Sequence, residues 1–167
     1  MRFTPVAFAL AMAVAVTSSV GYGAQREADP RAAALIAEGR SELASGQVQA
    51  ATDSFEAALA IDPGYTPIYL ELAEAARASD LQGKAIHYYR VALKRDPNNL
   101  AAISGEGEAL LEKGAVEKAR RNLAQLESIC GGDCAETRQL ASALARGAQS
   151  SVLTAEAVAP DPVVTKN

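Results

Sequence analysis

The chain has 167 residues, which is room for one domain with tails. Nearly half of its residues are apolar, but only 5% are aromatic. Ala-rich composition of this kind favours close helix–helix packing and argues against a β-sandwich. The net charge of −4 and the absence of a basic stripe argue against nucleic-acid binding.

The first 24 residues have the order of a secretory signal peptide. Arg2 provides a positive start, residues 6–16 form an unbroken apolar run, and small residues follow through Ala24. The apolar run is too short to span a membrane, which takes about 20 residues. No Cys stands near its end to carry a lipid. We therefore expect residues 1–24 to be removed and the chain to be periplasmic or secreted, with no membrane span afterwards.

A 34-residue period follows. Asp62-Pro63 recurs as Asp96-Pro97, and residues before each Pro recur with the same spacing. The matching pairs are Ala51 and Ala85, Phe55 and Tyr89, and Ala58 and Ala92. One further step of 34 reaches Ala119, Leu123 and Leu126. Three registers in phase indicate a tandem repeat.

Each repeat has the pattern of a helical hairpin. Apolar residues in the second half of the first repeat, such as Ala51, Phe55 and Ala58, recur at spacings of three and four, which places them on one helix face. Gly46 and Gly114 suit a helix end with positive φ, and Asp80 occupies the equivalent position between them. Pro67 suits the first position of a helix, with Thr66 as its cap.

These positions resemble the tetratricopeptide repeat (TPR) family, which has a small residue at its eighth position, Gly at the turn, and then Ala, a large residue, Ala and Pro. The residues that carry the resemblance are Gly39, Gly46, Phe55 and Pro63 in the first repeat, Ala73, Ala85, Tyr89 and Pro97 in the second, and Gly107, Gly114, Ala119 and Leu123 in the third. Gly131 replaces the third closing Pro. The resemblance implies an all-α fold, a right-handed α-solenoid.

The boundaries follow from the register. We expect a TPR domain over residues 30–146, with repeats at about 32–65, 66–99 and 100–131 and a capping helix at about 134–146. The capping helix would place Leu140 and Leu144 on one face, and Asp133 with Glu136 has the spacing of a capping box. Residues 147–167 hold Ser, Thr, Pro and Ala with little charge, which predicts a disordered tail.

Cys130 and Cys134 lie between the third repeat and the capping helix. An even pair in an exported protein favours a structural disulfide. A thiol–disulfide redox pair is the alternative, because a thiol at the start of a helix has a lowered pKa. Metal binding is disfavoured, since zinc takes four ligands and the single His87 lies far away in sequence.

The sequence predicts no catalytic residue and no cofactor. His87 is the only candidate base, and it lies in a helical pattern beside Tyr88 and Tyr89. Gly-rich phosphate-binding motifs are absent from the sequence.

In the TPR family the first helices of the repeats line a concave groove that binds polypeptides. By register, the resemblance assigns this groove Ile36, Arg40, Leu43, Leu70, Glu74, Arg77, Ser104, Glu108 and Leu111. The Lys and Asn clamp of TPR domains that grip a carboxylate tail is missing, because the matched positions hold Ile36, Arg40, Leu70 and Glu74.

This set mixes apolar residues with both signs of charge, which suits an amphipathic helix or an extended peptide. The predicted function is therefore a non-enzymatic protein-interaction adaptor. Two alternatives stay open: a redox partner that uses Cys130 and Cys134, and a repeat protein that self-associates into a larger assembly.

Overall fold

The computed structural model of the chain describes residues 26–157, and side chains over residues 26–147. The expected signal peptide and residues 158–167 of the expected tail lie outside the described residues. The described part contains helices and turns but no strand. Its helices are α1 (Pro30–Ala44), α2 (Val48–Ile61), α3 (Pro67–Ala78), α4 (Gln82–Arg95), α5 (Leu100–Glu112), α6 (Val116–Cys130) and α7 (Ala135–Ala157).

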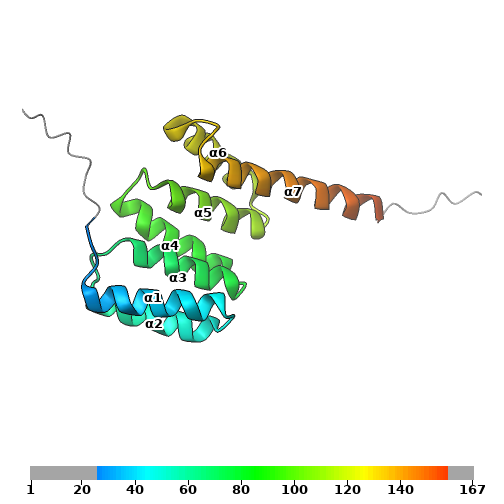
Figure 1. Cartoon of the computed structure of the whole chain (residues 1–167). Coiled ribbons are helices and arrows are strands. Elements are labelled where there is room, and N and C mark those ends of the chain that lie inside the picture. Colours follow the sequence, from blue (N-terminus) through cyan, green and yellow to red (C-terminus); the bar gives the residue numbers. More distant parts are fainter. Residues whose placement is uncertain (1–25, 158–167) are drawn as a thin grey trace, which may run out of the picture.

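The helices form three antiparallel hairpins, α1–α2, α3–α4 and α5–α6, which stack in chain order, and α7 covers α5 and α6 (Figure 1). This is the right-handed α-solenoid that the resemblance implied. The first helices also contact one another, since α1 packs on α3, α3 on α5, and α5 on α7. Among the described residues, α2, α4 and α6 make no such contacts with each other. The layer of α1, α3, α5 and α7 is therefore the inner, more tightly curved side.

Close approach of paired helices explains the small residue at the eighth repeat position. A Cβ atom added at Gly39 would lie 2.5 Å from the ring of Phe55 on α2. A Cβ atom at Gly107 would lie 2.5 Å from the Leu140 side chain of α7. Ala73, at the equivalent position of the second repeat, is fully buried. The capping helix therefore packs where a further hairpin would otherwise continue the stack.

The core is divided along the solenoid. One cluster contains Phe55, Ile68 and Leu72 and joins the first hairpin to α3. A second surrounds Tyr89, and a third contains Leu126 and Leu140. Burying a side chain of this size stabilises the fold by roughly 1.5–3 kcal/mol. Because each cluster includes residues of neighbouring hairpins, no hairpin completes its core alone.

Inside each hairpin the turn uses a left-handed residue at the same register position. Gly46 has φ +77° and Gly114 has φ +80°, while Asp80 has φ +59°. Asp80 is the one non-glycine residue with positive φ in the described part of the chain. Side chains at such positions crowd the backbone, so the second turn is the least favourable of the three.

Two predicted helix starts differ in detail. Thr66 does precede α3, but its side chain makes no capping hydrogen bond and its backbone is already helical. Asp133 and Glu136 do not form a capping box, because α7 begins at Ala135 and the Cys134 carbonyl accepts from the Arg138 amide at 3.1 Å. Side-chain caps occur instead at two starts that the sequence analysis did not single out, from Asp29 on α1 and Asn99 on α5.

The capping helix is longer than the sequence predicts. The expected tail begins at residue 147, whereas α7 continues to Ala157. Gly147 does not end the helix, because a single glycine inside a helix costs only about 1 kcal/mol relative to Ala. None of the described helices is both long and apolar enough to cross a membrane.

Candidate functional site

The inner layer of helices carries an open groove over the second and third repeats. One hollow of about 410 Å³ is lined by Leu43 of α1, Glu74, Arg77 and Ala78 of α3, and Glu112 of α5. A second of about 210 Å³ is lined by Arg77, Glu108, Leu111, Glu112, Ala143 and Arg146. Because the two share Arg77 and Glu112, they form one continuous surface across α1, α3, α5 and α7, which we call the inner groove.

Arg77 lies at the centre of the inner groove, and its side chain is only 17% exposed. Its Nη2 atom is 2.8 Å from Glu108 Oε2, and its Nε donates to Glu112 Oε2 at 3.2 Å. Its Nη1 donates to Glu74 at 3.3 Å. Burial by itself lowers the pKa of Arg77, but the hydrogen bond to Glu112 and the charge of Glu74 outweigh it and raise the pKa. Arg77 therefore stays charged and joins α3 to α5.

Tyr89 contacts this network from the core. Its ring is buried in the core, and its hydroxyl donates a hydrogen bond to Glu74. Burial raises the pKa of Tyr89, and the Glu74 carboxylate raises it further. The tyrosine is thus a neutral donor, which fixes the Glu74 carboxylate beside Arg77.

The structure places the nine residues that the register assigns to the groove in three groups: five line the inner groove, two lie outside its lining and two are in the core. Those in the lining are Leu43, Glu74, Arg77, Glu108 and Leu111. Arg40 and Leu70 lie outside its lining. Arg40 is exposed and its Nε donates to Glu71 at 2.9 Å, while the partly buried Leu70 packs against the core cluster around Tyr89.

Two predicted groove residues are buried instead. Ile36 is 5% exposed and belongs to the core cluster around Phe55. Ser104 is 2% exposed and its hydroxyl donates to the Glu136 carbonyl at 3.3 Å, because α7 covers this end of α5. Neither side chain is open to a partner in this structure.

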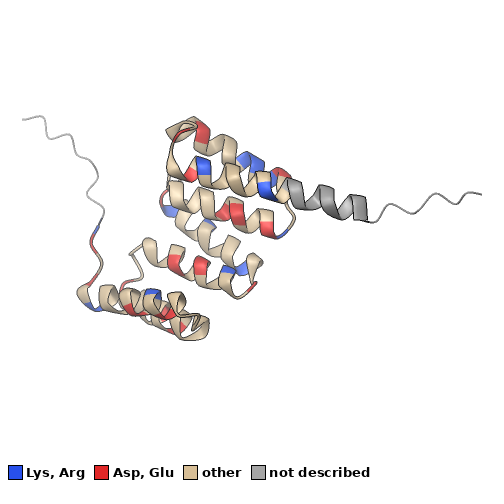
Figure 2. Cartoon of the chain, turned by 45° about the vertical axis from the view of Figure 1, so that its right-hand side comes forward, with Lys and Arg blue, Asp and Glu red and all other residues tan. Residues whose placement is uncertain are grey.

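Four lining residues were not predicted: Ala78, Glu112, Ala143 and Arg146. Glu112 lies one helical turn after Glu108, so the period of α5 could have identified it. Ala143 and Arg146 belong to α7, which has no equivalent in the three-repeat register. Charges of both signs are interspersed along the ribbons, without one face of a single sign in this view (Figure 2).

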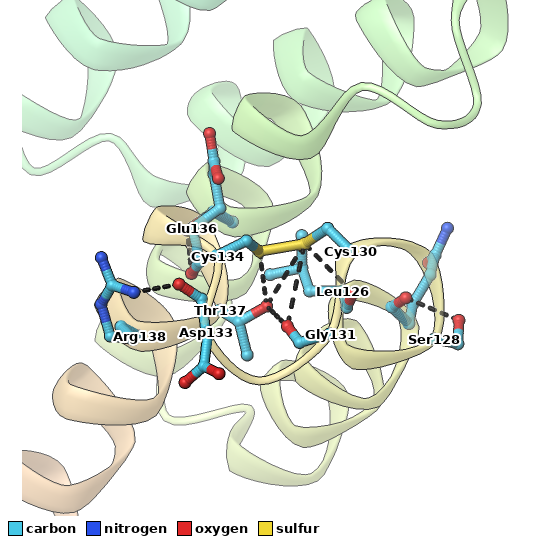
Figure 3. The surroundings of a disulfide bond; sticks show 11 residues. Leu126, Ser128, Cys130, Gly131, Asp133, Cys134, Glu136, Thr137 and Arg138 are labelled. Carbon is cyan, nitrogen blue, oxygen red and sulfur yellow. Dashed lines mark hydrogen bonds between the residues drawn. A yellow bond between two sulfur atoms is a disulfide. The ribbon is translucent and has the colours of Figure 1, made fainter.

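At the other end of the third repeat a disulfide joins Cys130 of α6 to Cys134, with Cα atoms 5.9 Å apart (Figure 3). Buried Thr137 lies beneath it: its hydroxyl donates to the Gly131 carbonyl at 2.9 Å and lies 2.9 Å from Cys134 Sγ. Gly131 has φ +83° and ends α6. The turn therefore ties the capping helix to the last repeat. That the pair is oxidised in the cell stays a prediction.

His87 is exposed and lies beside Tyr88, with ring centroids 5.9 Å apart. Within the described residues, no three His, Cys, Asp or Glu side chains gather as a metal-binding group.

Comparison with solved structures assigns the fold. The chain superposes on the TPR domain of Sgt2 from Aspergillus fumigatus with a TM-score of 0.64 and 23% identity, over 84% of this chain and 91% of that one. The chain has the TPR fold. It also matches the first TPR domain of Spaghetti (RPAP3) bound to the HSP90 peptide SRMEEVD, with a TM-score of 0.64 and 17% identity, over 78% of this chain and 99% of that one.

The first TPR domain of human RPAP3 is a third similar structure, with a TM-score of 0.60 and 19% identity over 72% of this chain and 97% of that one. No protein-family model matches the chain, and no curated protein matches it. The likeness is therefore one of TPR architecture, and the surface of this TPR domain has to be interpreted from its own residues.

Proposed function

We propose that this TPR domain is a non-enzymatic protein-interaction adaptor that binds a peptide or helix of its partner in the inner groove. The observation that carries the proposal is the continuous hollow over α1, α3, α5 and α7, with Arg77 and Glu112 at its centre. A structurally similar TPR domain binds the HSP90 peptide SRMEEVD. Leu43 and Leu111 offer apolar contact, and the charged side chains between them set selectivity.

The charges of the groove favour a partner segment with Lys or Arg. Three carboxylates line it, from Glu74, Glu108 and Glu112, against two cations, Arg77 and Arg146. Arg77 already forms ion pairs with all three carboxylates. Glu74 and Glu112 are 48% and 37% exposed, so their carboxylates remain accessible to a bound cation although they also accept from Arg77. An acidic tail such as SRMEEVD would instead meet like charges.

Selection from a random peptide library tests this function. We expect selected peptides to be enriched in Lys and Arg, and Glu112→Gln to weaken the best of them by about tenfold, or about 1.4 kcal/mol. The matched control is Glu127→Gln, an exposed glutamate on α6 away from the groove lining. Failure to enrich any sequence, or equal weakening by both variants, would exclude the inner groove as the binding site.

We place this adaptor in the periplasm or cell envelope. The signal-like residues 1–24 and the close Cys pair support that location. Mass analysis of protein from the envelope under non-reducing alkylation tests both features. We expect a chain that starts after residue 23 or 24 and carries no alkylated thiol; a full-length chain with two alkylated cysteines would contradict the placement.

The reduction potential of the Cys130–Cys134 pair distinguishes a structural disulfide from a redox-active one. A structural disulfide has a potential below about −300 mV, whereas a labile pair has a higher one. The hydroxyl of buried Thr137 donates to the Gly131 carbonyl and lies next to Cys134 Sγ, which stabilises the turn and favours the structural role.

A further inference from the structure

A third hollow, of about 330 Å³, lies where α4 meets the turn between α5 and α6, and it shares no lining residue with the inner groove. Buried Ile86 and Leu110 contribute apolar surface. Three cationic side chains line it, from Arg90, Lys113 and Lys118, and no carboxylate does. We call this the basic hollow.

The charge of the basic hollow can be compared with that of the equivalent positions one repeat earlier. One repeat earlier, Arg90 and Lys118 correspond to Glu56 and Lys84. Those two residues face each other across the first junction, with Lys84 Nζ 4.0 Å from Glu56 Oε1. At the second junction Arg replaces the Glu, so the Lys loses its carboxylate partner. Lys113 adds a further cation where the first junction has Ser79.

Neighbouring acids neutralise one of the three cations but neither lysine. Glu106, whose side chain is only 10% exposed, accepts from Arg90 Nε at 2.7 Å, and its other oxygen accepts from Asn122. Glu117, next to Lys118, pairs with Arg120 at 3.8 Å. Within the described residues, Lys113 and Lys118 form no ion pair.

Two helix starts add to the positive charge. The Lys113 ammonium reaches the first turn of α4, where it lies 3.8 Å from the place of a Cβ atom on Gly83. Lys118 lies in the first turn of α6, and neither helix has a side-chain cap. Cations near helix N-termini are unfavourable because the backbone dipole is positive there. An anion between the lysines would relieve that repulsion.

We propose that the basic hollow binds an oxyanion, a phosphate or a carboxylate, borne by a ligand or partner that also contacts Ile86 and Leu110. The lysines supply charge from two sides, and the absence of a side chain at Gly83 leaves room beneath Lys113. This site is independent of the proposed peptide groove, and either can exist without the other.

The test is an NMR titration of the ¹⁵N-labelled full chain with sodium phosphate, and separately with a hexaglutamate peptide, against sodium chloride at equal ionic strength. We expect saturable shifts of the amides of Gly83, Gly114 and Lys118 with at least one of the two probes. Phosphate alone would identify a phosphate source, and the peptide alone a carboxylate source.

The decisive variant replaces Lys113 and Lys118 by Gln, and the matched control is Lys84→Gln at the first junction. We expect the double variant to bind at least about tenfold more weakly and the control to bind like the wild type, with both spectra showing the folded chain. No saturable shift beyond that of chloride with either probe, or equal binding by the double variant, would overturn the proposal.

Discussion

The two junctions between repeats have the same packing but different arrangements of charge. On the inner side, the first junction has exposed Arg40 paired with the half-buried Glu71, whereas the second has Arg77 enclosed by Glu108 and Glu112. Next to the second helices, the first junction has a balanced Glu–Lys pair, whereas the second has Arg90 paired with Glu106 and two lysines without a carboxylate partner.

This comparison shows how a repeat protein separates fold from function. Ala51 and Ala85, or Phe55 and Tyr89, keep the same buried places in both repeats because the stack needs them. Charged positions at the same junctions differ between the repeats, as Glu56 and Arg90 do, because the packing of the stack does not require them. The basic hollow and the Arg77 network at the centre of the inner groove both lie at the second junction, so we expect variants there to affect function more than equivalent variants at the first.

The largest expected effect comes from removing the central arginine. Arg77→Ala leaves Glu108 and Glu112 close together without a cation, and we expect it to lower the free energy of unfolding by about 2–3 kcal/mol. Arg40→Ala removes a cation that is 61% exposed and should cost about 1 kcal/mol or less. Urea denaturation of both variants measures the difference, and equal costs would show that the two junctions are not energetically distinct.

Substitutions in the hairpin turns are expected to have the next largest effect on stability. Asp80→Gly removes a side chain from a left-handed residue and should stabilise the chain by about 1 kcal/mol. Gly46→Ala makes the opposite change in the first turn and should destabilise it by a similar amount. Thermal unfolding followed by circular dichroism measures both, and a destabilising Asp80→Gly would mean that the Asp side chain itself supports the turn.

The ends of the first two hairpins are expected to differ in how their contribution to stability depends on pH. Asp62 is buried and accepts from the Asp29 amide at 3.0 Å, and Arg26 lies 2.8 Å from its other oxygen. The Asp29 hydrogen bond, more than Arg26, lowers the pKa of Asp62. Its contribution to stability is therefore present above the unfolded-state pKa of about 3.9 and is lost as the pH falls through the lower folded value.

We accordingly expect Asp62→Asn to reduce stability at pH 7 and to flatten the loss of stability below about pH 4. Asp96, its counterpart in the second repeat, is exposed and accepts from Asn99, so Asp96→Asn is the matched control. Urea denaturation from pH 2.5 to pH 7 compares them. Identical pH profiles for the wild type and Asp62→Asn would contradict the assignment.

The smallest effect on stability is expected from reproducing the charges of the basic hollow at the first junction. Glu56→Arg together with Ser79→Lys copies the charges of the second junction, and it should change stability by less than about 1 kcal/mol because the Glu56–Lys84 pair is exposed. We expect a second set of oxyanion-dependent amide shifts at residues 49–52 and 80–84. Without such shifts, the charges alone do not make the site.

The sequence was sufficient for the scaffold because its signals are local. Gly46, Gly114 and the Asp-Pro pairs mark every hairpin, and the small eighth-position residues fit against Phe55 and Leu140 as a close helix pair requires. The composition of residues 147–167 does not reveal the end of α7, because Ser, Thr and Ala with little charge suggest a tail from residue 147 whereas the helix continues to Ala157.

The binding surface was less predictable because it depends on contacts between distant residues. Arg77 meets Glu112 from 35 positions away, and Tyr89 meets Glu74 from another helix. Register placed Ser104 on the correct helix, but only the position of α7 determines that it is buried. The sequence does not predict a site at Lys113 and Lys118. Their arrangement becomes apparent only when the second junction is compared with the first, where Glu56 faces Lys84.

Site-specific photocrosslinking in intact cells shows most directly whether the inner groove is the partner-binding surface. A photoreactive residue at Leu43 or Leu111 lies in the groove, and one at exposed Arg121 on α6 lies outside its lining. We expect a discrete crosslinked species from both groove positions and none from Arg121. Crosslinking from Arg121 alone would contradict it.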